Sequence, residues 1–299
     1  MHCAKVIQKR KKTLYNFSLV KYNADITNPA HGKKERETIM KKIIALFLSL
    51  LLIAACFAGC QSADSGSDAA YVKKNGKLIV GITDYAPMDY KDENGEWTGF
   101  DAELARLFAA ELGVDCEFFV IADWGKKFYE LESKNIDVIW NGMTINEDVT
   151  LNTNCSDPYV INAQVVVMKA DVVDKYTTPE SLKDLTIAVE NGSAGQDAAA
   201  ATGAKTIVPV QDQAAALMEV AAGTSQACVI DITMARAMTG EGTSYADLKA
   251  GISLTSEEYG VGFRKESDLT AKLNEFFNKL KADGTMQALA EKYNLALVE

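Results

Sequence analysis

The sequence predicts an α/β protein of two lobes that are joined by two crossing segments. Between residues 77 and 140, short apolar runs alternate with helical patterns, as expected for a parallel sheet covered by helices on both faces. The same alternation restarts after residue 163, and the chain returns near residue 256 for a last strand and two helices. A chain of 299 residues with 48% hydrophobic residues is large enough for two modest cores.

Residues 40–60 have the pattern of a secretory signal. Met40 is followed by two lysines and a short apolar run, which ends in Cys56-Phe-Ala-Gly-Cys60. Small residues directly before a cysteine resemble the bacterial lipobox, whose cysteine is lipidated and becomes N-terminal. We therefore expect a lipid on Cys60, although Cys56 fits the pattern almost as well. The alternative is a transmembrane anchor, which the shortness of the run disfavours.

The segments on either side of this signal have separate interpretations. Residues 33–37, Lys-Lys-Glu-Arg-Glu, can be encoded by purine-only codons, as a translated ribosome-binding site would be. We expect translation to begin at Met40 and residues 1–39 to be an upstream extension of doubtful translation, with a genuine basic tail as the alternative. Residues 61–70 are small and polar and predict a flexible tether.

The charge of residues 60–299 excludes several classes of function. These residues carry 20 basic and 38 acidic side chains, a net charge of −18, which repels nucleic acid and anionic lipid.

Residues 60–299 contain no histidine, because His2 and His31 lie upstream. Ser-His-Asp catalysis, Cys-His catalysis and histidine-based zinc sites are therefore excluded. We expect no nucleic-acid partner, no catalytic residue, no cofactor and no metal.

Three further cysteines, Cys116, Cys155 and Cys228, are widely spaced. They form no Cys-x-x-Cys pair and no even-numbered framework. We expect them to be small buried apolar residues, and a single disulfide among them is the alternative.

Lobe 1 is assigned to residues 71–162 and 258–299. Its strands are expected at 77–83, 116–121, 136–140 and 259–263, and its helices at 100–112, 124–132, 268–281 and 284–293. The helix at 100–112 is the clearest, because apolar residues recur on one face and Gly113 ends it. After the strand 136–140 we expect an exposed loop at Asn141-Gly142.

Lobe 2 is assigned to residues 163–257. Its strands are expected at 164–170, 185–190, 205–209 and 227–231, and its helices at 179–184, 194–201, 211–222 and 232–239. The chain crosses between the lobes near 160–164 and again at 256–258. Two such crossings form a hinge that lets the lobes close on a small ligand.

The order and spacing of several short motifs resemble the extracytoplasmic solute-binding proteins of polar amino-acid ABC transporters, family 3. The motifs are Tyr85-Ala-Pro, Asn94-Gly95, Gly99-Phe-Asp, Gly142-Met-Thr, Ser156-Asp-Pro-Tyr, Glu258-Tyr-Gly and Asp283-Gly284. The resemblance covers nearly all of the chain from Lys77 onward. It implies a two-lobed type II periplasmic-binding-protein fold with the ligand cleft between the lobes.

The resemblance also implies aromatic contacts to the ligand. In that family an aromatic ring lies against the ligand at the position of Tyr85, and Trp124 aligns with the opposing ring. Rings in this arrangement can hold an apolar side chain or a cation. Trp140, at the end of its strand, is a third candidate wall. Ordinary core packing is the alternative for Tyr85 and Trp124.

The segment Asn141, Gly142 and Thr144 matches the loop that holds the ligand in the family. There a carbonyl receives the ligand's ammonium, and an N–H and a hydroxyl receive its carboxylate. From lobe 2, Ser193 and Ala194 open a helix whose free N–H groups and dipole suit the same carboxylate. A plain helix cap by Ser193 is the alternative.

The charged positions predict which ligand is preferred. Asp231 matches the acidic partner of the ligand's ammonium, and capping of the next helix is its alternative role. Val149 stands where the family has an arginine that binds the ligand's carboxylate. Glu190 adds a negative charge beside the cleft. We therefore expect a neutral zwitterionic or basic ligand rather than an acidic one. Two points stay open: Glu190 could face solvent, and the holder of the carboxylate is unidentified, with Arg236 as a remote substitute.

We expect a monomeric receptor, lipid-anchored outside the cell membrane, that captures an amino acid or a related polar nitrogen compound and delivers it to ABC permease subunits. A cyclohexadienyl-dehydratase-like enzyme on the same fold is one alternative. The missing histidines and the absence of G-x-S-x-G, Walker and G-x-G-x-x-G patterns disfavour it. A ligand-sensing module is the other alternative.

Overall fold

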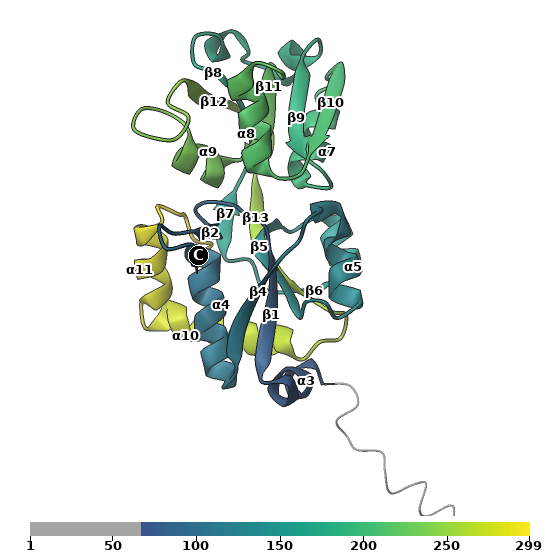
Figure 1. The fold of residues 1–299 in the computed structure, drawn as a ribbon, viewed down its shortest axis with the longest axis vertical. Coiled ribbons are helices and arrows are strands. Elements are labelled where there is room, and N and C mark those ends of the chain that lie inside the picture. Colours follow the sequence, from purple (N-terminus) through teal and green to yellow (C-terminus); the bar gives the residue numbers. More distant parts are fainter. Residues whose placement is uncertain (1–66) are drawn as a thin grey trace, which may run out of the picture. The chain divides into compact units, whose positions relative to one another are not determined.

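The computed structural model describes residues 67–299, which belong to one compact unit. The predicted signal, its cysteines Cys56 and Cys60, and residues 61–66 of the predicted tether lie outside the described residues. Within residues 67–299, no helix is both long and apolar enough to span a membrane. The prediction of a two-lobed α/β protein is confirmed: residues 67–299 form two large sheets and one small two-stranded sheet (Figure 1).

Lobe 1 is built on a six-stranded sheet in the order β4-β1-β5-β13-β6, with β7 also paired to β13. The strands are β1 (Lys77–Ile82), β4 (Asp115–Val120), β5 (Val138–Thr144), β6 (Asn154–Cys155), β7 (Val160–Asn162) and β13 (Glu257–Phe263). Strand β1 is parallel to β4 and β5, whereas β13 is antiparallel to its neighbours. The sheet is therefore mixed, because the last strand returns from lobe 2 in the opposite direction.

The helices of lobe 1 flank this sheet (Figure 1). They are α3 (Asp68–Asn75), α4 (Phe100–Leu112), the 3₁₀ turn η1 (Trp124–Lys126), α5 (Lys127–Glu132), α6 (Glu147–Asn152), α10 (Leu269–Ala282) and α11 (Thr285–Lys292). A small hairpin, β2 (Tyr90–Lys91) with β3 (Trp97–Thr98), precedes α4. The helix predicted at 100–112 is confirmed at both ends, and Gly113 ends it in the left-handed conformation.

Lobe 2 is built on a five-stranded sheet in the order β10-β9-β11-β8-β12. Its strands are β8 (Gln164–Lys169), β9 (Thr186–Glu190), β10 (Thr206–Val210), β11 (Ala227–Asp231) and β12 (Leu248–Ser253). Its helices are η2 (Val173–Lys175), η3 (Pro179–Leu182), α7 (Ala194–Ala201), α8 (Gln213–Ala222) and α9 (Ile232–Met238). The predicted strands and the helices α7, α8 and α9 are confirmed within two residues at each end, whereas β12 was not predicted.

Two strands carry the chain between the sheets. Strand β7 leads through Ala163 into β8, and residues 254–256 lead from β12 into β13. The two crossings pair with each other, with Asn162 opposite Glu257. The polar side chains of these residues are therefore held at the junction of the lobes.

The expected exposed loop at Asn141-Gly142 is wrong. Strand β5 continues through these residues to Thr144, and Asn141 and Gly142 are buried. The reason is non-local: β13 runs beside the end of β5 and pairs with Met143 and Thr144, which gives their backbone groups partners. The ligand-loop motif is thus the end of a central strand.

The expected tether is also wrong for its last residues. Helix α3 begins at Asp68, and the Ser67 hydroxyl accepts a bond from the N–H of Ala70, which caps it. The Asp68 carboxylate pairs with Arg264 at 3.1 Å, and both side chains are largely buried. These contacts attach α3 to lobe 1.

The three cysteines of the described residues are free thiols. Cys228 is buried as expected, whereas Cys116 and Cys155 are partly exposed. Burial raises the pKa of the Cys116 thiol to about 12 and that of Cys155 to about 11, so both stay protonated near neutral pH.

Candidate ligand-binding site

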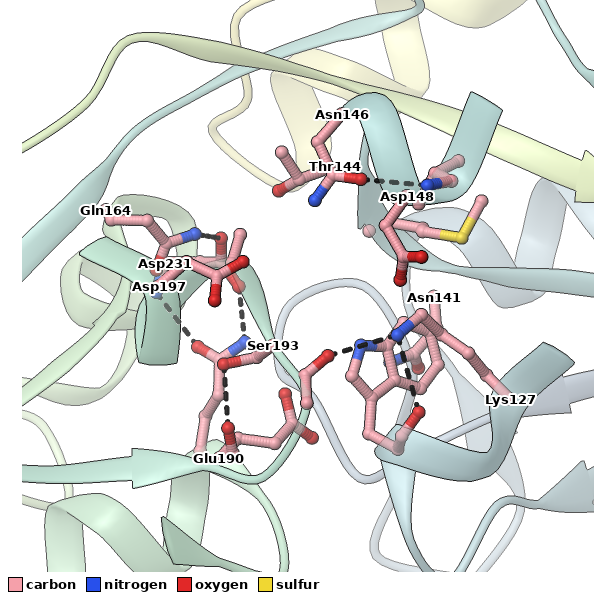
Figure 2. A pocket seen from close by; sticks show the side chains of 17 residues that line it. Lys127, Asn141, Thr144, Asn146, Asp148, Gln164, Glu190, Ser193, Asp197 and Asp231 are labelled. Carbon is pink, nitrogen blue, oxygen red and sulfur yellow. Dashed lines mark hydrogen bonds between the residues drawn. The ribbon is translucent and has the colours of Figure 1, made fainter. Parts of the chain in front are cut away.

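A cavity of about 50 Å³ lies where the strand ends of the two sheets face each other (Figure 2). This volume holds only a few water molecules, so a larger ligand needs the lobes to open or side chains to shift. Both lobes contribute side chains. The lining residues are Trp124, Lys127, Asn141, Gly142, Met143, Thr144, Asn146, Asp148, Val149, Gln164, Glu190, Gly192, Ser193, Ala194, Asp197, Gln213 and Asp231.

Trp124 forms part of the lobe 1 wall. It begins η1 directly after Asp123, whose carboxylate accepts a bond from the N–H of Gly125 and so fixes the turn. The indole is almost fully buried against Ile121 and Val149. The structure places this predicted ring on the cavity.

Tyr85 lies behind the cavity wall. A Cβ at Gly142 would lie 2.6 Å from Tyr85 Cε1, and Gly142 has a positive φ of 53°, so only glycine fits between the ring and the cavity. The Tyr85 hydroxyl forms hydrogen bonds with Thr233 and Tyr259. In this structure Tyr85 thus connects lobe 1 with α9 of lobe 2, and it does not line the cavity.

Trp140 belongs to the core of lobe 1. Its side chain is 0% exposed, and its ring lies edge-on to Phe277, with centroids 5.8 Å apart, and to Phe108 at 6.2 Å. The expectation that Trp140 forms a third wall is wrong here, because successive side chains of a strand face opposite sides of the sheet. Its neighbour Asn141 faces the cavity instead.

The polar groups at the end of β5 already have partners. The Asn141 amide bonds to the backbone N–H and the hydroxyl of Thr83, both at 2.7 Å. The N–H of Gly142 donates to Asp101, and the Thr144 hydroxyl donates to Glu257 at 2.7 Å. The Thr144 hydroxyl is therefore not free to receive a ligand carboxylate, contrary to expectation, and the Gly142 N–H is occupied as well.

Ser193 and Ala194 stand at the start of α7 in lobe 2. The Ser193 hydroxyl accepts a bond from the N–H of Gln196 at 3.2 Å and donates to the carbonyl of Glu190 at 2.8 Å. Ser193 is thus the helix cap that the sequence allowed as an alternative. Both residues also line the cavity, so the N-terminus of α7 faces it.

Glu190 ends β9 and points into the cavity (Figure 2). Its side chain is 3% exposed, which contradicts the alternative that it faces solvent. Within the part of the chain that the structure describes, Glu190 Oε1 has no hydrogen-bond partner. Burial, and next the charge of Asp231, raise the pKa of Glu190 well above its usual value.

Asp231 ends β11 and is 4% exposed. It occupies the N-cap position of α9 but makes no side-chain cap bond, so helix capping does not explain it. Its carboxylate accepts bonds from the side-chain amides of Asn162, Gln164 and Gln213. Burial first, and then the charge of Glu257, raise the pKa of Asp231 to about 6.

Sequence reasoning missed the amides around Asp231 and the lysine on the opposite wall. Lys127 begins α5, is 5% exposed, and donates to the carbonyl of Gly192 at 3.0 Å. Its ammonium lies 5.1 Å from the centre of the Trp124 ring and 4.7 Å from that of Phe128. Burial lowers the pKa of Lys127. The only feature of the sequence that pointed to Lys127 as a site residue was its position shortly after Trp124.

The position of the missing arginine is apolar. Val149 is 2% exposed and packs in a cluster with Ile136, Ile139 and Met143. Arg236, the remote substitute, is exposed on α9 and does not line the cavity. Four carboxylates line the cavity, Asp148, Glu190, Asp197 and Asp231, whereas Lys127 is the one cation among its described lining residues.

Comparison with known proteins identifies the family of this chain. Residues 78–296 match the family model described as bacterial extracellular solute-binding proteins, family 3. The arginine-binding extracellular protein ArtP of Bacillus subtilis is 30% identical over 259 residues, which cover 82% of this chain and 96% of ArtP.

Solved structures show the same two-lobed fold. A mutant of ArgBP from T. maritima is 33% identical, with a TM-score of 0.71, covering 76% of this chain and 98% of that protein. The ancestral amino acid-binding protein AncCDT-1, a precursor of cyclohexadienyl dehydratase, is 32% identical, with a TM-score of 0.69, covering 76% of this chain and 99% of that one. The chain belongs to the bacterial extracellular solute-binding proteins of family 3.

Proposed function

We propose that this protein is the extracytoplasmic receptor of an ABC importer for a basic amino acid such as arginine. The ligand's α-ammonium binds Asp231, and its cationic side chain lies against Glu190. Because the cavity contains several carboxylates and little positive charge, an acidic amino acid is rejected. The protein carries the ligand to the permease and does not transform it.

The observation that carries this proposal is the pair of buried carboxylates, Glu190 and Asp231, on one cavity wall. Burying an ionised carboxylate without a cation costs several kcal/mol. Glu190 Oε1 lacks a partner among residues 67–299, and both groups have raised pKa values. A ligand with two cationic groups compensates both carboxylates at once and favours their ionised forms.

The relatives support the same ligand class. ArtP is named an arginine-binding protein, and ArgBP from T. maritima has been solved in an arginine-bound form. The match with AncCDT-1, itself an amino acid-binding protein, also supports binding rather than catalysis.

The membrane attachment is part of the proposal. Family 3 proteins act outside the cytoplasm, and we propose that a lipid on Cys60 holds this protein at the membrane as a monomer beside the permease. Cys60 lies outside the residues that the structure describes, so this part of the proposal rests on the lipobox-like sequence alone.

Calorimetric titration with single amino acids tests the ligand class. We expect arginine, lysine, ornithine or histidine to bind at least tenfold more tightly than glutamine. Aspartate and glutamate should be the weakest ligands. Tight binding of aspartate or glutamate, with no binding of basic amino acids, would overturn the proposal. The bound ligand should also be recovered unchanged by mass spectrometry, whereas a dehydrated or decarboxylated product would indicate an enzyme.

A further inference from the structure

We propose that Lys127, beside the N-terminus of α7 that the family resemblance already assigns to the ligand's α-carboxylate, binds this carboxylate in place of the arginine that Val149 replaces. This inference rests on the proposed function, because it assumes a ligand with an amino-acid carboxylate. It identifies the positive end of a cavity that otherwise carries negative charge.

The first argument is the environment of the Lys127 ammonium. It is 5% exposed, and within residues 67–299 its hydrogen-bond partners are the carbonyls of Gly192 and Trp124, at 3.0 and 3.5 Å. No described carboxylate forms an ion pair with it. An ammonium that has lost most of its water needs an anion, and two carbonyls and two ring faces compensate it only in part. A ligand carboxylate would complete this site.

The second argument is where this ammonium is held. Its partner Gly192 directly precedes Ser193, the cap of α7, so the ammonium lies beside the start of that helix. The first N–H groups of a helix have no partner within its regular hydrogen-bond pattern and carry its positive dipole end. In the eight-residue α7, Ser193 caps the N–H of Gln196, which leaves those of Ala194 and Gly195 at this end. Two independent sources of positive potential therefore meet at one place on the cavity.

The third argument is that this place is fixed by close packing across the cavity. Gly192 has a φ of +71°, and a Cβ there would lie 2.5 Å from the Cα of Gly125. The turn before α5 thus touches the turn before α7. The Asn191 amide also donates to Asp123 at 2.9 Å. These contacts fix the position of Lys127 relative to the start of α7 when the lobes are closed.

The fourth argument is that several competing donors are already occupied or missing. The Thr144 hydroxyl and the Gly142 N–H already donate to Glu257 and Asp101. Val149 is buried among apolar side chains and has no side-chain donor. Among the described lining residues, Lys127 is the only cation. A carboxylate therefore finds its most favourable position between Lys127 and α7.

The competing role for Lys127 is to balance the cavity's own acids. Asp148 has the largest effect of any charged group on the Lys127 pKa, followed by Glu190 and Asp197. If balancing these acids were its only role, Lys127 would influence every cationic ligand alike. An amino acid and its decarboxylated amine separate the two roles, because only the amino acid carries the carboxylate.

The experiment measures affinities of the full extracytoplasmic chain by calorimetry for three pairs: arginine with agmatine, histidine with histamine, and phenylalanine with phenethylamine. The variants are Lys127→Gln and Lys127→Arg, with Lys126→Gln as the control, since Lys126 is exposed and outside the cavity. Thermal unfolding of each ligand-free variant checks that it is folded.

We expect Lys127→Gln to weaken binding of the amino acid about ten- to a hundredfold, the effect of one charge-assisted contact. Its effect on the amine should be absent, or the amine should bind more tightly. Lys127→Arg should restore most of the affinity, and Lys126→Gln should leave both ligands unchanged. Equal weakening of amino acid and amine, in every pair that binds, would overturn the role of Lys127. If only phenylalanine and phenethylamine bind, the proposal of a basic ligand is overturned. The role of Lys127 can still be tested by comparing these two ligands.

Discussion

Asp231 and Glu257 lie on different strands, yet the same two side-chain amides donate to both carboxylates. Gln164 Nε2 lies 2.7 Å from Asp231 Oδ1 and 2.6 Å from Glu257 Oε1, and the Asn162 amide also bonds both acids. Glu257 begins β13, the strand that returns from lobe 2 to lobe 1. The proposed ammonium site is therefore linked directly to the crossing between the lobes.

This link predicts that ligand affinity depends on pH. The pKa of Asp231 is raised from its ordinary value of 3.8 to about 6 in the empty protein. A ligand ammonium requires the ionised form, so we expect affinity for arginine to fall as the pH decreases through about 6, by at most tenfold per pH unit. In the empty protein, the raised pKa favours the protonated form. The contribution of Asp231 to folding stability is therefore present at low pH and is lost as the pH rises from 3.8 toward 6.

Titrations between pH 5 and 8 measure this dependence. Glu257→Gln removes the second cause of the raised pKa, so the midpoint should move to lower pH. Glu258→Gln is the matched control, because Glu258 is the exposed neighbour of Glu257. Affinity that stays constant over this pH range, or a midpoint that both variants shift equally, would contradict the coupling.

A second prediction concerns the glycine between Tyr85 and the cavity. Gly142→Ala adds a Cβ 2.6 Å from Tyr85 Cε1 and 3.1 Å from Tyr259 Cε2 at a φ of +53°. We expect a loss of about 3 kcal/mol or more in the free energy of unfolding, from backbone strain and overpacking together. Gly203→Ala, at a φ of +73° with no atom within 4 Å, should cost only about 1–2 kcal/mol. Urea unfolding of both variants measures the difference, and equal losses would show that the space behind Gly142 is not restricted.

A third prediction concerns closure of the lobes. The Tyr85 hydroxyl bonds Thr233 on α9, a contact between the lobes. Ligand should reduce the radius of gyration measured by X-ray scattering, because it holds the lobes together. Tyr85→Phe should weaken ligand binding about three- to tenfold, the usual effect of one neutral hydrogen bond. The exposed Tyr129→Phe should have no effect. A scattering profile that saturating ligand leaves unchanged would argue against closure.

A fourth prediction concerns membrane attachment. Cys60→Ala should prevent lipid modification and should release the protein into the medium or leave its precursor uncleaved. Metabolic labelling with a fatty acid, followed by cell fractionation, measures both effects. Label that remains on Cys60→Ala and disappears from Cys56→Ala would place the lipid on the other cysteine.

Local patterns in the sequence were sufficient to predict most of the elements. Helix α4 was predicted to the residue, since its apolar face and terminal glycine are local signals. The end of β5 was mispredicted because the strand that completes it, β13, lies more than a hundred residues later. The pairing that extends β5 to Thr144 cannot be read from the residues next to it.

The candidate site was predictable only in part for the same reason. Glu190 and Asp231 stand at strand ends, and the resemblance to the family was what singled them out. Trp140 was assigned to the wrong side of the sheet. Successive side chains of a strand face opposite sides, and the sequence alone does not show which of them face the core. Lys127 and Glu257 were missed because their importance comes from partners far away in the chain, Gly192 and Thr144.

The central claim is that Glu190 and Asp231 select a cationic ligand, and the comparison of arginine with citrulline tests it most directly. Citrulline has nearly the same shape as arginine but a neutral side chain. We expect the wild-type protein to bind arginine about ten- to a hundredfold more tightly than citrulline, and Glu190→Gln to remove most of this preference. Equal affinity of the wild-type protein for the two ligands, unchanged in Glu190→Gln, would contradict the account.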